Sequence, residues 1–254
     1  MILSNAKTNI EDIMKSFIIP AMIIMLLSFN SCNLLRNCEK GNSTIAEKEL
    51  SLQGIKSVSI SGSGDLYIID DNNEMVKVRT DNNLMDKIIF EVKGDKLSIK
   101  TDGNLCPTKL DFYLSAKALE EIDVSGSCTV VSQVPFNGNK FEVEVSGSGS
   151  VELPEVNVNR FDIEISGSGS VDAIGNADNV EAEISGSGSL YMESFVTKNI
   201  NAEISGSGSI EIQVEETINA ELSGSGSILY WGNPKISSEV SGSGAIRKAY
   251  EQEK

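Results

Sequence analysis

The chain has 254 residues, a net charge of −16 and no histidine. The negative charge argues against binding to nucleic acid or to anionic lipid, because both would repel it. Without histidine the chain lacks the commonest general base and the commonest ligand of transition metals, so we expect neither an enzyme nor a cofactor.

The first 31 residues have the pattern of a targeting segment. Met14 and Lys15 precede an apolar run over residues 17–29, which is too short to span a bilayer and is typical of a secretory signal peptide. Cys32 directly follows a small residue at the expected cleavage point, an arrangement that resembles the lipobox of bacterial lipoproteins. We predict a signal peptide over residues 1–31, with Met14 as an alternative start, and lipid attachment at Cys32. The alternative is an ordinary cleaved signal peptide in which Cys32 is incidental.

This pattern predicts a lipid-anchored protein of the cell envelope, most simply of the outer membrane, on either its periplasmic or its surface face. Residues 32–49 are polar and are interpreted as a lipidated tether. Residues 50–120 contain short alternating segments typical of strands, and no segment has helical periodicity of useful length. The segment from Phe90 to Ile99 fits a hairpin with Gly94 and Asp95 in its turn.

Three cysteines remain after lipidation of Cys32. An odd number in an oxidising compartment leaves one thiol unpaired. A bridge between Cys38 and Cys106 is one prediction, which would leave Cys128 free. The chain contains no CxxC pair, so we expect no structural zinc site.

Residues 121–247 repeat one tetrapeptide at nearly constant spacing, and residues 248–254 form a polar tail. Ser-Gly-Ser-Gly begins at positions 146, 166, 185, 205, 223 and 241, and the variant Ser-Gly-Ser-Cys begins at position 125. Steps of 18 to 21 residues indicate a repeat architecture. Apolar residues alternate with polar ones before and after each copy, so the segments are predicted to be strands with one buried face rather than a flexible linker.

Two architectures fit this repeat. Neighbouring copies would run in opposite directions in an antiparallel meander or barrel, whereas a solenoid stacks each copy on the equivalent residues of the one before. The near-identity of the copies favours the solenoid. We expect both glycines of each copy to face the core, so that Gly186→Val would overpack it. Cys128 takes the place of one such glycine and is expected to be a buried structural thiol.

Three parts of the chain together resemble a known family. They are Ile55-Lys-Ser-Val-Ser-Ile-Ser-Gly-Ser-Gly-Asp-Leu66, Leu119-Glu-Glu-Ile-Asp-Val-Ser-Gly-Ser127 and the Ser-Gly-Ser-Gly coils that follow. Over residues 50–247 the chain resembles the bacterial head GIN domain family, described as putative auto-transporter adhesins. The resemblance implies an all-β, right-handed parallel β-helix in Bacteroidetes-type envelope lipoproteins, and it carries no catalytic motif.

The function that we expect is adhesion or the binding of a surface ligand, either a glycan or a protein. A purely structural envelope spacer is the alternative. A polysaccharide-acting β-helix enzyme fits less well, because only Arg160, Lys198 and Lys235 supply basic groups between residues 141 and 238.

A column of carboxylates is predicted on the outward face of the solenoid. One glutamate lies two residues before the first serine of each copy, and stacked coils would set these side chains about 4.8 Å apart. Neighbouring unit charges at that distance repel by roughly 1 kcal/mol in bulk water. We hypothesise that the column loosely binds Ca²⁺; the alternative is a solvated face that prevents lateral aggregation. Its members are Glu144, Glu164, Glu183, Glu203, Glu221 and Glu239.

A second outward feature is an apolar contact patch. Tyr191, Leu229 and Trp231 all fall on the outward phase near the C-terminal end of the repeats. We interpret them either as a contact surface or as a cover for the end of the solenoid.

Overall fold

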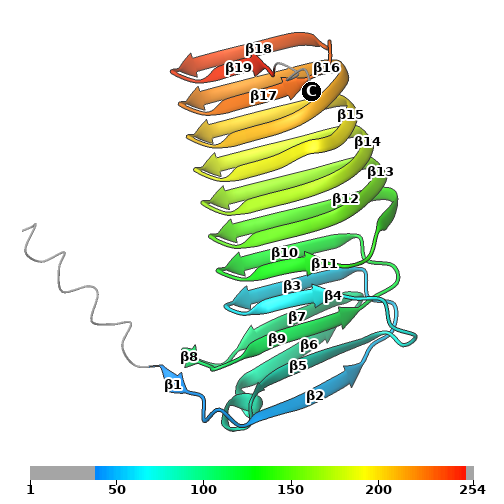
Figure 1. The fold of residues 1–254 in the computed structure, drawn as a ribbon, viewed down its shortest axis with the longest axis vertical. Helices are drawn as coiled ribbons and strands as arrows, with labels where there is room; N and C mark the ends of the chain where they lie inside the picture. Colours follow the sequence, from blue (N-terminus) through cyan, green and yellow to red (C-terminus); the bar gives the residue numbers. More distant parts are fainter. Residues whose placement is uncertain (1–37, 250–254) are drawn as a thin grey trace, which may run out of the picture. The chain divides into compact units, whose positions relative to one another are not determined.

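The computed structural model describes residues 38–249, so the predicted signal peptide, Cys32 and the last five residues lie outside the described part. From Lys40 onward the chain forms one compact unit. This unit is a nearly all-β solenoid of about 6 turns, which confirms the predicted fold class (Figure 1). None of the helices in residues 38–249 has the length and hydropathy needed to cross a bilayer.

The repeats form long curved strands, each of which makes most of one coil. A strand begins just after the second glycine of one tetrapeptide and ends at the first glycine of the next, so each coil has a sharp corner at the tetrapeptide and a wider bend opposite (Figure 1). The strands are β12 (Phe136–Gly147), β13 (Ser150–Gly167), β14 (Ser170–Gly186), β15 (Ser189–Gly206) and β16 (Ser209–Gly224), followed by β17 (Ser227–Trp231), β18 (Lys235–Gly242) and β19 (Ala245–Lys248).

Neighbouring coils pair in parallel and in register, with like residue on like. Ser166 lies opposite Ser185, which in turn lies opposite Ser205. At each corner the N–H of the second serine donates to the glycine carbonyl of the preceding coil, as Ser187 does to Gly167 at 2.7 Å. The corner is therefore bonded as regularly as the strands on either side of it.

The N-terminal part adds coils whose order in space differs from their order in sequence. β3 (Ser57–Gly62) and β4 (Asp65–Ile68) pair in parallel with β10 (Glu121–Gly126) and β11 (Thr129–Ser132) on one side. On the other side they pair in parallel with β7 (Lys96–Thr101) and β9 (Leu110–Ser115), which come later in the chain. The parallel stacking thus begins with a tetrapeptide at residues 61–64, well before residue 121.

Antiparallel strands complete this N-terminal end. The predicted hairpin is confirmed: β6 (Ile88–Lys93) pairs with β7, Phe90 lies opposite Ile99, and Gly94 has a φ of 65° in the turn. β5 (Met75–Asp81) pairs antiparallel with both β9 and β2 (Ile45–Ser51). The sequence did not predict the 3₁₀ helix η2 (Asn82–Lys87), and β1 (Glu39–Lys40) with β8 (Leu105–Cys106) forms a small separate sheet.

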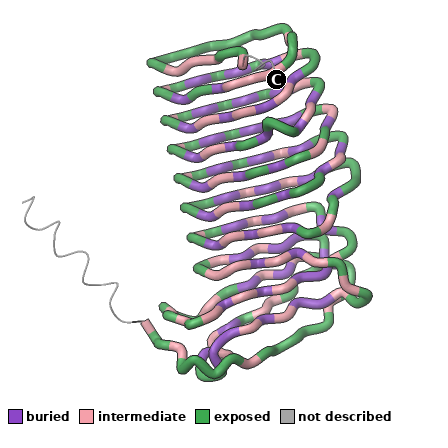
Figure 2. Tube along the Cα trace, viewed as in Figure 1, coloured by how far each residue is buried: buried purple, intermediate pink, exposed green. Residues whose placement is uncertain are grey.

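The core runs through the middle of the coils, between their two limbs. Figure 2 shows buried residues alternating with more exposed ones along the coils below the last one. Valine, isoleucine and leucine fill most inward positions, and a row of phenylalanines occupies the side of the wider bend. The ring centroids of Phe141 and Phe161 are 5.9 Å apart, and those of Phe161 and Phe195 are 5.6 Å apart. This ladder gives the bend an ordered apolar filling.

The two glycines of each tetrapeptide have different roles, so the expectation that both face the core is wrong for the first. Gly186, a first glycine, has a φ of 119°, and a Cβ there would lie 2.5 Å from the carbonyl oxygen of Gly167 in the coil before. Gly188, a second glycine, is buried, and a Cβ there would lie 2.4 Å from Cγ2 of Ile165. The chain turns its corner at the first glycine, which breaks the strand phase that the sequence analysis extended through it.

The cysteines agree with their expected states. Cys38 and Cys106 are both disulfide-bonded, as a bridge between them requires. Cys128 is a free thiol with no exposed surface, which confirms its buried structural position.

Candidate functional site

The strongest candidate site is the outward face of the limb that precedes each corner. Two columns of polar side chains run along this face from coil to coil. The predicted carboxylates pair in register from Glu144 to Glu239, which confirms their alignment, and Asp123 of β10 extends the row by one coil. We call this row, with Asp123, the acidic column. The second row, the mixed column, consists of Glu121, Glu142, Asp162, Glu181, Asn201, Asn219 and Ser237.

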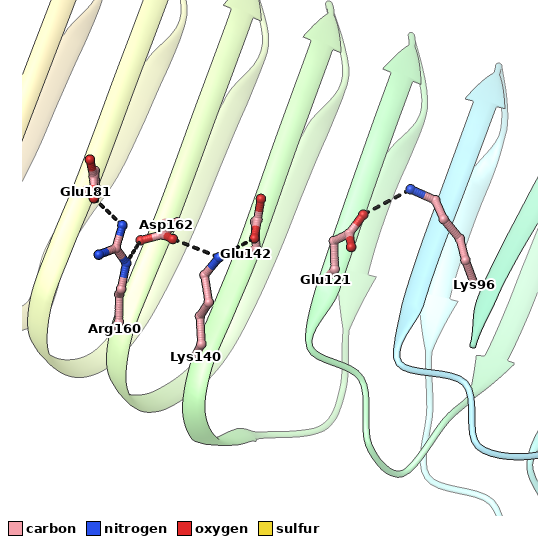
Figure 3. Close-up of polar contacts among 7 residues, drawn as sticks. All are labelled: Lys96, Glu121, Lys140, Glu142, Arg160, Asp162 and Glu181. Carbon is pink, nitrogen blue, oxygen red and sulfur yellow. Dashed lines mark hydrogen bonds and ion pairs between the residues drawn. The ribbon is translucent and has the colours of Figure 1, made fainter. Parts of the chain in front are cut away.

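Basic side chains neutralise the N-terminal half of the mixed column (Figure 3). Lys140 contacts Glu142 and lies 3.0 Å from Asp162, while Arg160 contacts Asp162 at 2.7 Å and also reaches Glu181. These bases are about half exposed, so each pair contributes only about 0–1 kcal/mol to stability. Their main effect is to link three coils through alternating charges.

The sequence analysis missed this network, although a signal was present. Lys140 and Arg160 each lie two residues before an acid, and residues two apart on a strand point to the same face. The stacked coils then bring each base beside the acid of the next coil as well. Lys96 could not have been found in this way, because it joins Glu121 at 3.0 Å only through the stacking of β7 beneath β3.

The C-terminal half of the face has a different chemistry. The mixed column becomes amides there, and Asn219 Nδ2 donates to Asn201 Oδ1 at 3.0 Å. Beside these amides, Glu203, Glu221 and Glu239 continue the acidic column and form no salt bridge within residues 38–249. The mixed column thus changes from paired charges to amides, while the acidic column from Glu144 onward forms no salt bridge within residues 38–249.

A groove of about 410 Å³ lies between the two columns over this C-terminal half. It crosses four coils, and each coil contributes one residue from each column. Carboxylates accept hydrogen bonds, while amides both donate and accept them. Three of the four coils therefore present a carboxylate beside an amide or a hydroxyl group, while the first coil presents two carboxylates, Glu181 and Glu183.

Burial and electrostatic repulsion act together on Glu144, near the N-terminal end of the acidic column. Partial burial raises the pKa of Glu144, and the charges of Asp123 and Glu164 on either side raise it further. No three side chains among Asp, Glu, Cys and His in residues 38–249 converge closely enough to hold a metal ion. The calcium hypothesis for the acidic column stays a prediction.

The predicted apolar patch is only partly brought together. Tyr191 is 44% exposed and shares a column with Leu229. Glu211 lies between them, and Trp231 lies one column further along, opposite Gln213. Leu229 and Trp231 are half-buried. A carboxylate thus interrupts the apolar surface, which is smaller than the sequence pattern indicated.

A cavity at the wider bend was not predicted from the sequence. It encloses about 740 Å³ at the wider bend, between the segments 69–70, 115–120 and 134–141. Buried Leu119 and Phe136 line it, and Lys117 and Glu120 lie at its exposed edge. Because its walls come from three separate segments of the chain, one of them the start of β12, no local motif marks it.

Known proteins agree with this fold. The chain resembles a putative adhesin from Bacteroides fragilis, which is 20% identical with a TM-score of 0.78 over 83% of this chain and 99% of that one. It also resembles a putative lipid binding protein from Parabacteroides distasonis (24% identity, TM-score 0.69, 84% of this chain and 100% of that one). A putative adhesin from the same organism is similar as well (23% identity, TM-score 0.69, 84% and 100% coverage). No protein of curated function matches the chain.

At these identities the solved structures establish the fold alone. The family is established by the sequence itself, because residues 55–234 match the family described as putative auto-transporter adhesin, head GIN domain. That match spans most of the chain and includes the acidic column from Asp123 to Glu221. The chain therefore belongs to the head GIN domain family of putative auto-transporter adhesins.

Proposed function

We propose that this protein is an exported envelope lipoprotein whose solenoid binds a repeating surface ligand, most simply a glycan, along the groove between its two columns. The groove carries the proposal, because three of its four coils each offer one carboxylate and one amide or hydroxyl group, at a regular spacing of about 4.8 Å. A polymer with evenly spaced hydroxyl groups can hydrogen-bond to several coils at once. The adhesin name of the family supports a role in binding.

The groove can be tested with two charge-matched variants on a glycan array. Glu203→Gln with Glu221→Gln removes two carboxylates from the groove, and binding should fall strongly. Glu215→Gln with Glu216→Gln removes the same charge from exposed positions outside the groove and should leave binding unchanged. Equal loss from both variants would mean that only the net charge matters, and no binding by the wild type would favour the structural spacer.

Anchoring at Cys32 is the second part of the proposal. Its support is the apolar run over residues 17–29 followed directly by this cysteine. Cys32→Ser should abolish incorporation of labelled fatty acid and release the protein from the outer membrane fraction. Unchanged labelling and fractionation would refute the anchor.

The cavity at the wider bend favours a second candidate, the binding of a lipid-like molecule. Its volume of about 740 Å³ and its mixed lining, in which Leu119 and Phe136 lie near Lys117 and Lys140, suit a ligand with a small apolar part and a polar head. The name of the similar Parabacteroides protein points the same way. Ala118 lines the cavity and is exposed, so Ala118→Trp should block a fluorescent fatty-acid probe without unfolding the chain. A probe that binds this variant as well as the wild type would exclude the cavity.

A further inference from the structure

The C-terminal end of the solenoid exposes residues that are buried in every coil below it. Ile236 and Val240 of β18 are 43% and 45% exposed, whereas Ile218 and Leu222, their partners in β16, are 0% and 2% exposed. Within residues 38–249, β18 pairs only with β16 and β19 pairs only with β17 (Figure 1). The last coil therefore has apolar core positions and a row of backbone groups with no coil above them.

An open strand edge of this kind is a template for another strand, and solenoids need a cover at such an end. β18 carries Lys235 and Glu239 at outward positions, and Ile236, Ser238 and Val240 at inward positions. This order is self-complementary. If the strand meets its own copy in antiparallel orientation with Ser238 opposite Ser238, then Ile236 lies opposite Val240 of the copy, and Val240 lies opposite Ile236.

We propose that a second copy of this chain covers this end, through antiparallel pairing of the two β18 strands about a two-fold axis at Ser238. The two cores then meet as a pair of isoleucine–valine contacts. Lys235 lies diagonal to Glu239 of the copy, within reach of a long side chain. Shifting the register by one residue would set outward residues against inward ones, and shifting it by two would lose both apolar pairs.

The two-fold arrangement also closes the assembly. Head-to-tail stacking would need the N-terminal end as partner and would continue into filaments. At that end β2 is an antiparallel strand whose exposed residues include Glu47, Lys48 and Glu49 in succession. β2 also exposes Ile45 and Leu50, each 39%, but its three successive charged residues oppose strand addition. β18 instead exposes Ile236 and Val240 at positions that are buried in β16.

Disulfide trapping in the full-length chain tests the proposed pairing. In Ser238→Cys the two introduced thiols face each other across the axis, and mild oxidation should give a cross-linked dimer. Ser243→Cys is the matched control, because it lies exposed in the same coil but five residues from the axis. At about 3.3 Å per residue its two copies are far beyond the 7 Å limit for a disulfide between Cα atoms. Several-fold more dimer from Ser238→Cys supports the proposal, and equal amounts overturn it.

A charge swap in the Ser238→Cys chain gives a second, independent readout. Lys235→Glu should reduce the cross-linked dimer, and Lys235→Glu with Glu239→Lys should restore it, because the diagonal pair is rebuilt with its charges exchanged. Both positions are exposed, so the variants leave the fold intact. Val240→Lys should abolish the dimer, whereas Val92→Lys, which changes a valine 43% exposed at the other end, should not. Failure of the swap to restore the dimer, or loss of it in Val92→Lys alone, would overturn the assignment.

Discussion

Replacing Gly186 with alanine tests the stacking at the corners directly. The φ of 119° is unfavourable for any residue with a Cβ, which costs roughly 1–3 kcal/mol. The new Cβ would also lie 2.5 Å from the carbonyl oxygen of Gly167, a backbone atom that cannot rotate away. Such overpacking costs roughly 1–3 kcal/mol. We therefore expect Gly186→Ala to lower the free energy of unfolding by about 2–6 kcal/mol in urea titrations followed by circular dichroism.

Three other glycines separate the two contributions. Gly138 has neither a positive φ nor any atom near its added Cβ, so Gly138→Ala should stay within about 0.5 kcal/mol of wild type. Gly103 has a φ of 87° and no atom near an added Cβ, so Gly103→Ala measures the cost of backbone strain alone. Gly188 has no positive φ, but a Cβ added there would lie 2.4 Å from Cγ2 of Ile165, so Gly188→Ala measures the cost of crowding alone. If Gly186→Ala cost no more than Gly103→Ala, the close stacking of corner on corner would be refuted.

Four further predictions concern the outward face and the buried thiol. The pKa of Glu144 is raised, so its carboxyl group binds a proton more tightly in the folded chain than in the unfolded chain. The difference in unfolding free energy between wild type and Glu144→Gln should therefore shrink as the pH falls from 7 towards 4.5. A difference that stays constant over this range would contradict the prediction. Burial raises the pKa of Cys128 to about 11, so this thiol should react with alkylating reagents only after unfolding. Trp231→Ser should change ligand binding, the oligomeric state or the solubility; if all three stay unchanged, the contact patch has no role. Calcium should raise the melting temperature more than a sodium salt of equal ionic strength, and an equal rise would leave the acidic column as a solvated face.

The repeat itself made much of the fold predictable. The constant step between tetrapeptides is enough to align Glu144 with Glu164 and the glutamates after it, because parallel coils of similar length must stack in register. Alternation likewise assigned Phe141 and Val143 to the core. At these positions the repeat spacing and the apolar alternation of the sequence agree with the contacts of the fold.

The missed features depend on contacts that the local pattern does not contain. β7 and β9 lie beneath β3 although they follow it in sequence, so no repeat spacing gives their place or the pairing of Lys96 with Glu121. The first glycines were assigned to the core because alternation was extended through a corner where the backbone adopts a positive φ. The cavity at the wider bend was missed because it exists only once three separate segments of the chain meet.

The orientation of the coil-to-coil hydrogen bonds has a mechanical consequence for the lipid anchoring proposed above. These bonds, such as Ser187 N–H to Gly167 O, join one coil to the next and therefore run along the stack rather than across it. A pull between the anchored end and the last coil loads them in tension, a few at a time. The stack should then yield from its end by peeling, coil after coil, with each step releasing 18 to 21 residues of slack. A cell held through this protein would be tethered by an extensible link whose length increases in discrete steps before the tether breaks.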